Sequence, residues 1–359
     1  MPTMKIQGGD LDLVEYDFNP FLPGENINTS GYEGEYDLIT VKGKVQVTVP
    51  ARIHLNVLDM NRFSPSRPGG GGIGFAIQNY CFVEAESIPE GLDIEYGREC
   101  IIRHIAEVFS QTVGYNGGFC ISIQDYERKH VGLGSTGSVL VAVLHAMNAV
   151  VGSPLSREQI RILVGNNYVE ETADCKVTLG FETGVGPAVI SYGGMAVLGD
   201  ELSLVYRHRF AEGRNVYIVI PPSEGVTSGE GEFSVLMNRA RSLDARDRHL
   251  KAYLVLMDLI PALQRDDLKA VGDVIWELEF RGSKRAEIEH NSYIIYQYMH
   301  MIRDAGFEFV GMSSVGPSIA IVSDLDEATA TERLEEIGLS IEISTKVDNS
   351  GLVVDLKDD

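Results

Sequence analysis

A glycine- and hydroxyl-rich stretch, followed at once by an apolar segment, constrains this chain more than any other feature. Residues 130–138 read HVGLGSTGS, and residues 139–150 are predominantly apolar, which predicts a helix. Glycines allow positive φ and a close approach of the backbone to a ligand. The first N–H groups of a helix have no partner within it, and the helix dipole favours an anion there. The stretch therefore predicts either a phosphate-binding loop or a tight turn before a buried helix.

Length and charge narrow the classes of protein. A chain of 359 residues suits two domains, and its net charge of −22 argues against a general nucleic-acid binder. A polyphosphate site must then be built locally from Arg, Lys, amide dipoles and Mg²⁺. The N-terminus lacks an apolar signal segment, and no apolar run reaches the ~20 residues of a membrane span. We therefore expect a cytoplasmic protein with neither a nucleic-acid nor a membrane partner.

The cysteine pattern does not predict a metal site. No two of the four cysteines are close enough in sequence to form a CxxC pair, so structural zinc is not expected. Buried free thiols in a reducing compartment are the default for such residues. The expectation covers Cys81, Cys100, Cys120 and Cys175.

Hydrophobic periodicity outlines the order of the elements. Alternation predicts a hairpin or two strands over residues 41–58, and residues 98–113 carry an apolar face at helical spacing. Ser156 and Gln159 have the spacing of a capping box, and their helix is expected to reach about Glu171. Further strands are predicted at 80–85, 92–96, 119–125, 216–221, 319–322 and 340–347. A polar lid is predicted at 224–232. Helices are predicted at about 248–303, with interruptions near Pro261 and Gly282, and at 326–337.

This order lacks strict βαβ alternation and is typical of an α+β fold. The strand–helix–strand ending is compatible with a ferredoxin-like C-terminal half. Two more glycine-rich segments lie at 180–194 and 311–318, and four consecutive glycines occupy 69–72. The glycine run is either a linker or a turn beside a ligand, and the strand that resumes at Phe75 favours the turn.

Two of these loops resemble motifs of a known superfamily. Residues 130–138 and 311–318 resemble the second and third motifs of the GHMP superfamily of small-molecule kinases. Within it, the chain resembles the β-ribofuranosylaminobenzene 5′-phosphate synthases over roughly residues 45–325. The stretches that carry this likeness are Arg52-Ile53-His54-Leu55 with Asp59 and Asn61, then Arg67, Gly71-Gly72-Ile73-Gly74, Thr183-Gly184-Val185-Gly186 and Tyr192-Gly193-Gly194, followed by 224–232, 256–263 and 311–317.

Two departures from that family concern the aromatic substrate. Residues 132–138 read GLGSTGS where the family usually has GLGSGTQ, and an N-terminal arm of about 40 residues is extra. With these departures, we expect the chain to resemble the C-nucleoside synthases of the formycin and pyrazofurin type, which are similar to this family. The resemblance implies a GHMP-kinase-like two-domain fold with a ribosomal-S5-domain-2-like N-terminal part. We therefore expect an N-terminal arm at 1–40, a GHMP N-terminal domain with the phosphate loop at 41–205, and a GHMP C-terminal domain at 206–359.

The reaction that this resemblance implies joins C1 of the ribose of phosphoribosyl pyrophosphate (PRPP) to a ring carbon. The acceptor would be an aromatic or heteroaromatic carboxylate, p-aminobenzoate or an aminopyrazole carboxylate, and pyrophosphate and CO₂ would leave. Departure of pyrophosphate needs Mg²⁺ and preorganised N–H donors. An ATP-dependent GHMP kinase, and a binding protein without chemistry, remain open as alternatives. A homodimer is also expected.

The resemblance assigns roles to the motif residues. Asp59, Arg67 and His54 are the catalytic candidates, and Asp59 and Glu182 the candidate ligands of Mg²⁺. As structural alternatives, Asp59 can cap a turn, Arg67 can be a solvated surface residue, and Arg52 with His54 can form a polar pair between strands. The candidate ligands of PRPP are Arg52, His130, Gly132, Gly134, Ser135, Thr136, Gly137 and Ser138, and those of the acceptor are Gly71, Gly72, Thr183, Ser313 and Ser314.

Overall fold

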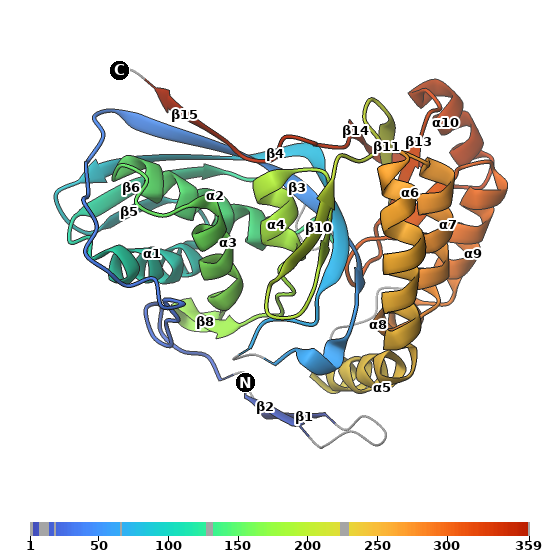
Figure 1. Ribbon diagram of the computed structural model, residues 1–359, viewed down its shortest axis with the longest axis horizontal. Coiled ribbons are helices and arrows are strands. Elements are labelled where there is room, and N and C mark those ends of the chain that lie inside the picture. The colour runs from blue at the N-terminus through green and yellow to red at the C-terminus, as the bar shows by residue number, and fades with distance from the viewer. Residues whose placement is uncertain are drawn as a thin grey trace.

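Two main β-sheets with helices packed against them form this protein (Figure 1). The computed structural model describes residues 3–6, 14–17, 19–64, 67–126, 132–222 and 230–357. This architecture confirms the α+β prediction. None of the helices in these ranges combines the length and the apolar character that a bilayer crossing needs.

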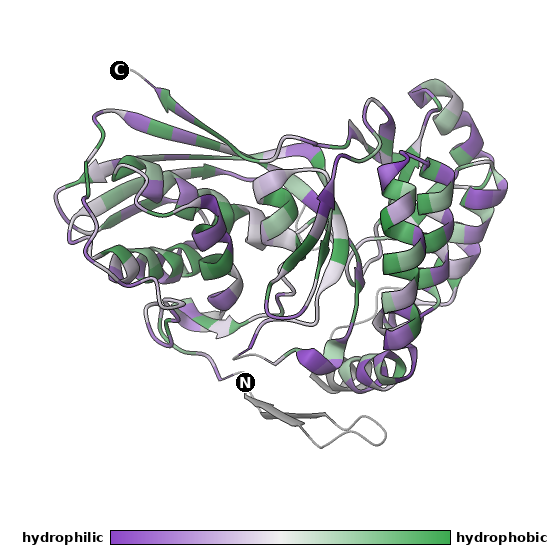
Figure 2. Ribbon diagram, in the orientation of Figure 1, coloured by the Kyte–Doolittle hydropathy of each residue, from purple (hydrophilic) through white to green (hydrophobic). Residues whose placement is uncertain are grey.

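The first sheet has seven strands and is built around a long antiparallel pair, β3 (Lys44–Val57) and β4 (Gly72–Ile88). Hydrophilic and hydrophobic residues alternate along β3 (Figure 2). The hydrophobic ones are buried. The predicted break within residues 41–58 is wrong, because Pro50 lies at a shift of register inside one strand rather than in a turn. The other strands of this sheet are β5 (Leu92–Glu95), β6 (Gly118–Gln124), β9 (Met195–Leu198), β10 (Leu204–His208) and β15 (Val353–Lys357).

Helices cover one side of the first sheet (Figure 1). They are α1 (Glu99–Val113), α2 (Ser135–Val150), α3 (Arg157–Asn166) and α4 (Val185–Tyr192). Nearly all side chains of α2 are buried, which accounts for the apolar run that follows the glycine-rich stretch. The predicted capping box of α3 is present, since Gln159 N donates to Ser156 Oγ at 3.3 Å and Ser156 N donates to Gln159 Oε1 at 2.9 Å.

The expectation that α3 reaches Glu171 is wrong. The helix ends at Asn166, and Asn167 then donates its side-chain amide to Leu163 O at 2.8 Å. Strands β7 (Val169–Thr172) and β8 (Lys176–Leu179) follow as a hairpin. Burial of Val169 and Val177 in the main core outweighs the helical spacing of this segment.

The second sheet is antiparallel, in the order β12 (Phe309–Met312), β13 (Ile319–Ser323), β11 (Asn215–Val219) and β14 (Ile341–Lys346). With its helices it agrees with the predicted ferredoxin-like half. A π-helical segment, Val255–Leu259, leads into α6, and Gly282 opens α8, so the chain departs from a regular helix near both predicted interruptions. The helices are α5 (Glu230–Leu254), α6 (Ile260–Gln264), α7 (Leu268–Glu279), α8 (Gly282–Asn291), α9 (Ile294–Asp304) and α10 (Glu327–Glu335).

The two halves do not separate at the expected boundary between residues 205 and 206. That boundary falls inside β10, which belongs to the first sheet. The last strand, β15, also returns to the first sheet and pairs with β3, red beside blue in Figure 1. It satisfies backbone groups of β3 that would otherwise form an open edge. Within the expected N-terminal arm, β1 (Thr3–Ile6) and β2 (Val14–Asp17) pair antiparallel, and most of the expected lid, residues 224–229, lies outside the described residues.

One pair of cysteines departs from the free-thiol expectation. Cys100, at the start of α1, forms a disulfide with Cys175, which lies 75 residues later beside the β7–β8 hairpin. Sequence spacing cannot show this pair, because folding alone brings the hairpin against α1. Cys81 and Cys120 are free, as expected.

Candidate functional site

The N-terminus of α2 forms the polar centre of the site. Gly134 precedes the helix with φ of +76°, and no described side chain caps the first turn. A Cβ at Gly134 would lie 2.6 Å from Arg52 Nε, so the guanidinium rests directly against the loop. Arg52 Nη1 also donates to Gly132 O at 2.8 Å. A helix N-terminus beside a fixed arginine is suited to bind a phosphate or pyrophosphate group.

The hydroxyl groups of the loop are already engaged by the protein. Ser135 Oγ donates to Asp125, and Thr136 Oγ1 accepts from Arg98 Nη2 at 2.8 Å and donates to Glu170 at 3.2 Å. The side chain of Ser138 is fully buried and accepts from the Tyr126 hydroxyl at 2.7 Å, and its contact with phosphate stays a prediction. His130 lies outside the described residues. The anion ligands offered by the described part of the loop are therefore chiefly backbone N–H groups.

A cavity of about 130 Å³ opens in front of this helix end. Its two ends differ in chemistry. Polar residues gather near α2, whereas the far end is apolar and includes Phe63 and Phe181, whose ring centroids lie 4.5 Å apart. The polar lining consists of Arg52, His54, Gly134, Gly137, Tyr168, Glu182, Thr183, Gly186, Glu287 and Ser314, and the apolar lining of Val57, Met60, Phe63, Phe181, Met237, Ala240 and Val315.

His54 projects from β3 into the polar end. Its Nε2 lies 3.2 Å from Thr183 Oγ1, and the side chain is buried. Burial, together with the positive charges of Arg52 and Lys284, holds the pKa of His54 well below its usual value. The imidazole is therefore neutral at physiological pH and can position a ligand without adding positive charge.

Glu182 is the acidic group beside Arg52. It is buried, and its Oε1 accepts from Gly184 N at 2.6 Å. Burial raises its pKa, against the opposing effect of that N–H group and of Arg52. The described residues contain no cluster of three His, Cys, Asp or Glu that could by itself hold a metal ion. One carboxylate next to a phosphate site does fit Mg²⁺, which is commonly held by one or two carboxylates plus substrate phosphates.

The Gly311–Ser318 loop packs against the glycine-rich loop that precedes α2. Ser313 Oγ donates to Gly132 O at 2.7 Å, and a Cβ at Gly132 would lie 2.7 Å from Ser313 O. Ser314 N donates to His54 O at 2.7 Å. Ser313 is fully buried and therefore joins loops rather than facing the cavity, whereas Ser314 and Thr183 line it.

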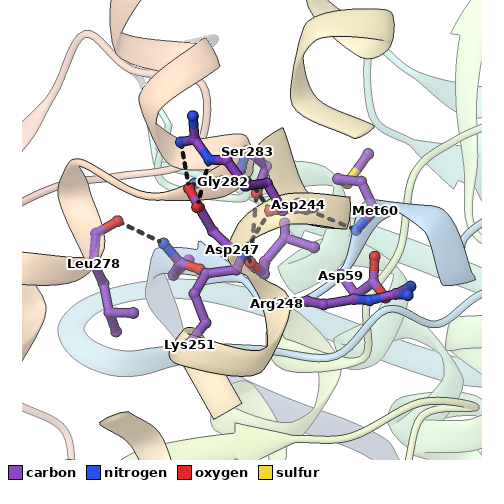
Figure 3. Close-up of polar contacts among 12 residues, drawn as sticks. Asp59, Met60, Asp244, Asp247, Arg248, Lys251, Leu278, Gly282 and Ser283 are labelled. Atoms are coloured by element: carbon purple, nitrogen blue, oxygen red, sulfur yellow. Dashed lines mark hydrogen bonds and ion pairs between the residues drawn. The ribbon is translucent and has the colours of Figure 1, made fainter. Parts of the chain in front are cut away.

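The structure does not bring Asp59 or Arg67 into the cavity lining. Asp59 caps the short 3₁₀ helix Met60–Arg62, with Oδ1 accepting from Asn61 N at 3.0 Å and Oδ2 lying 3.4 Å from Arg248 Nη1 (Figure 3). Arg67 is half exposed and ion-pairs with Asp200 at 3.2 Å and with Glu201 at 2.7 Å. In this structure Asp59 thus caps a turn and Arg67 lies at the surface, which are the structural alternatives given for them above.

Gly71 and Gly72 also lie outside the cavity lining. A Cβ at Gly71 would lie 2.2 Å from Leu198 O, and one at Gly72 would lie 2.6 Å from Asn56 O. These glycines permit close backbone packing where β4 meets its neighbours, and their contact with an acceptor stays a prediction.

Sequence reasoning missed two residues of α8. Glu287 lines the cavity, and the buried Lys284 one turn earlier donates to Ser314 O at 2.7 Å. Their helix carries no motif of its own, so only its packing against the site reveals them. The apolar pair Phe63 and Phe181 likewise gave no recognisable pattern.

Comparisons with known proteins found similar sequences and similar folds. A model described as the GHMP kinases N terminal domain matches residues 100–176, which include the phosphate loop. The chain is 24% identical over 318 residues to beta-ribofuranosylphenol 5′-phosphate synthase of Methanothermobacter thermautotrophicus, covering 81% of this chain and 92% of that protein. It is 26% identical over 341 residues to the protein of the same name from Archaeoglobus fulgidus, covering 87% of this chain and 100% of that protein.

Solved structures share the fold at low sequence identity. Homoserine kinase from Cytophaga hutchinsonii aligns with a TM-score of 0.62 and 15% identity, covering 88% of this chain and 98% of that one. Mevalonate diphosphate decarboxylase from Staphylococcus aureus aligns with a TM-score of 0.61 and 15% identity, covering 87% and 98%. The matched domain, the relatives along most of the chain and the common fold make this protein similar to members of the GHMP superfamily.

Proposed function

We propose that this protein is a PRPP-dependent synthase that joins C1 of ribose 5-phosphate to a ring carbon of an aromatic or heteroaromatic carboxylate. The observation that carries the proposal is the two-ended cavity, with Arg52 and the N-terminus of α2 at one end and the apolar pair Phe63 and Phe181 at the other. The two kinds of lining match the chemistry of a phosphorylated sugar next to a flat ring. The names of the relatives support the same class, because their product carries ribose 5-phosphate on a phenol ring.

The proposed reaction balances without an external oxidant or base. The bond from ribose C1 to pyrophosphate breaks, and its electron pair leaves with pyrophosphate. A ring carbon supplies the pair for the new C–C bond. The ring then loses CO₂, and the electron pair of the broken C–carboxylate bond restores aromaticity.

The chain's own groups match these demands. Arg52 and the first N–H groups of α2 stabilise the charge that develops on pyrophosphate. Neutral His54 and Thr183 orient the sugar phosphate. The apolar end excludes water, which would otherwise hydrolyse an oxocarbenium-like carbon.

Mg²⁺ is part of this proposal as an ion carried by the phosphates of PRPP. It would neutralise charge on the leaving group, with Glu182 as its protein ligand. Asp59 is the poorer candidate, because its two carboxylate oxygens already contact Asn61 and Arg248.

A coupled assay tests the proposal. The protein is incubated with Mg²⁺, PRPP and carboxyl-labelled p-aminobenzoate, p-hydroxybenzoate or an aminopyrazole carboxylate, and released pyrophosphate and CO₂ are measured. We expect both products in equal amounts with one of these acceptor classes. Phosphorylation of a small alcohol from ATP, with no turnover of PRPP, would instead identify a kinase, and binding of PRPP with no turnover of any acceptor would favour a binding protein.

We propose an aminopyrazole carboxylate as the acceptor, because residues 135–138 depart from the loop that is usual in the family. A cytoplasmic homodimer also remains a proposal. Light scattering of the purified protein tests the dimer.

A further inference from the structure

Glu287 places a carboxylate in the lining of the cavity. It lies on α8, and the preceding Ala286 packs in a buried cluster with Met60, Met237 and Ala240. Its side chain is only 13% exposed. The other carboxylate of the lining, Glu182, feels the charge of Arg52. Glu287 and Glu182 are therefore the two acidic side chains among the described lining residues.

Lys284 fixes the position of this carboxylate. Its Nζ lies 2.7 Å from Glu287 Oε2 and donates to Ser314 O at 2.7 Å and to Met312 O at 3.3 Å. The ammonium group is fully buried, and it donates to the loop and ion-pairs with Glu287. The buried Oε2 of Glu287 has no hydrogen-bond partner among the described residues, so the carboxylate can accept a hydrogen bond from a ligand.

We infer that Glu287 recognises the acceptor, by accepting a charge-assisted hydrogen bond from an N–H or O–H group on its ring. The inference rests on the proposed function and names the group that selects the second substrate. A ring without such a donor would cover the carboxylate and remove its water without replacing the hydrogen bond. A carboxylate that accepts from a ring amine or hydroxyl also raises the electron density of the ring, which favours attack on ribose C1.

The test compares ring substituents in the wild type and in Glu287→Gln, which keeps the shape and removes the charge. The probes are p-aminobenzoate and p-methylbenzoate, and an aminopyrazole carboxylate and its methyl analogue, with each Ki or KM measured under saturating PRPP. In the wild type we expect the amino compound to bind at least about tenfold more tightly than its methyl analogue. In Glu287→Gln we expect that ratio to fall to about threefold or less, with the KM for PRPP changed by less than about twofold.

A matched control lies two residues further along α8. Glu289 is equally shielded, 13% exposed, and ion-pairs with Arg285 and Arg239 away from the cavity lining. Glu289→Gln should leave the ratio of amino to methyl analogue unchanged. Glu287→Asp keeps the charge and should retain part of the preference, which separates loss of recognition from a general disturbance of α8.

The outcomes separate this inference from the proposed function. If the wild type releases no pyrophosphate from PRPP with any acceptor, the proposed function fails. The inference is overturned if the wild type turns over PRPP but Glu287→Gln keeps the wild-type preference for the amino compound over its methyl analogue. It is also overturned if Glu287→Gln raises only the KM for PRPP, because Glu287 then does not bind the acceptor.

Discussion

Lys251 and Asp244 form an ion pair in which neither side chain is exposed to solvent (Figure 3). Lys251 also donates to Val57 O at 2.7 Å, and Asp244 accepts from Met60 N at 2.8 Å and from Ser283 N at 2.7 Å. The pair therefore ties the end of β3 to α5 and α8. It fixes the apolar end of the cavity, to which Val57 and Met60 belong.

Removing the lysine should destabilise the fold strongly. Lys251→Met leaves the Asp244 carboxylate buried without its counter-charge, so we expect the free energy of unfolding to fall by about 3–5 kcal/mol. Urea titration at neutral pH measures the change. Lys269→Met is the control, since Lys269 pairs with Asp273 on an exposed surface and should cost less than about 1 kcal/mol. Equal losses in the two variants would contradict the importance of the buried pair.

The stability of the protein should depend on pH through Glu279. Burial raises the pKa of this carboxyl to about 8, and its Oε2 has no hydrogen-bond partner among the described residues. Between the usual pKa of 4.5 and about 8, the folded state binds a proton that the unfolded state has lost. The contribution of Glu279 is thus complete at low pH and is lost as the pH rises, by about 1 kcal/mol per pH unit.

Glu279→Gln isolates this effect, because the amide does not titrate. We expect the stability of the variant relative to the wild type to rise between about pH 5 and pH 8. Chemical denaturation at several pH values gives the difference. A difference that stays constant across this window would show that Glu279 ionises normally.

The close approach of Gly134 to Arg52 predicts a specific loss of PRPP binding. Gly134→Ala places a Cβ against the guanidinium, and we expect kcat/KM for PRPP to fall by about 10- to 100-fold. Gly114→Ala is the matched control, because Gly114 has φ of +70° but no atom within 4 Å of the added Cβ. That control should lose about 1 kcal/mol of stability and keep its KM. Similar KM changes in both variants would point to backbone strain alone.

Two arginines of the N-terminal signature should behave differently. Arg52→Ala removes the cation at the phosphate loop, and we expect kcat to fall by about 100-fold or more. Arg67→Ala removes an exposed partner of Asp200 and Glu201 and should change kcat and KM by less than about threefold. Steady-state kinetics with varied PRPP tests both. A large change in kcat or KM for Arg67→Ala would instead support a catalytic role for Arg67.

The disulfide should contribute to stability. Cys100→Ser opens a cross-link between α1 and the segment before β8, and we expect a loss of about 2–5 kcal/mol under oxidising conditions. Cys120→Ser, at a free and half-buried thiol, should cost much less. Thiol titration of the denatured wild type without reductant should count two thiols. Four reactive thiols in that titration would mean that the pair is reduced in the purified protein.

Local features were readable from the sequence because they depend on neighbours along the chain. Alternation predicted the buried face of β3, and the spacing of Ser156 and Gln159 predicted the cap of α3. The glycine-rich stretch predicted the start of α2, since only a residue that tolerates positive φ suits Gly134. These patterns record a strand period, a helix period or one backbone angle.

Only the tertiary structure decided which of the named residues meet. It joined Arg52, His54, Glu182 and Ser314 around one cavity, and it engaged Asp59 and Arg67 elsewhere. It also brought in Lys284 and Glu287, returned β15 to β3, and paired Cys100 with Cys175. Each of these depends on how buried faces distant in sequence pack together. The sequence by itself therefore determined the glycine-rich loop and its helix, and packing determined what faces that loop.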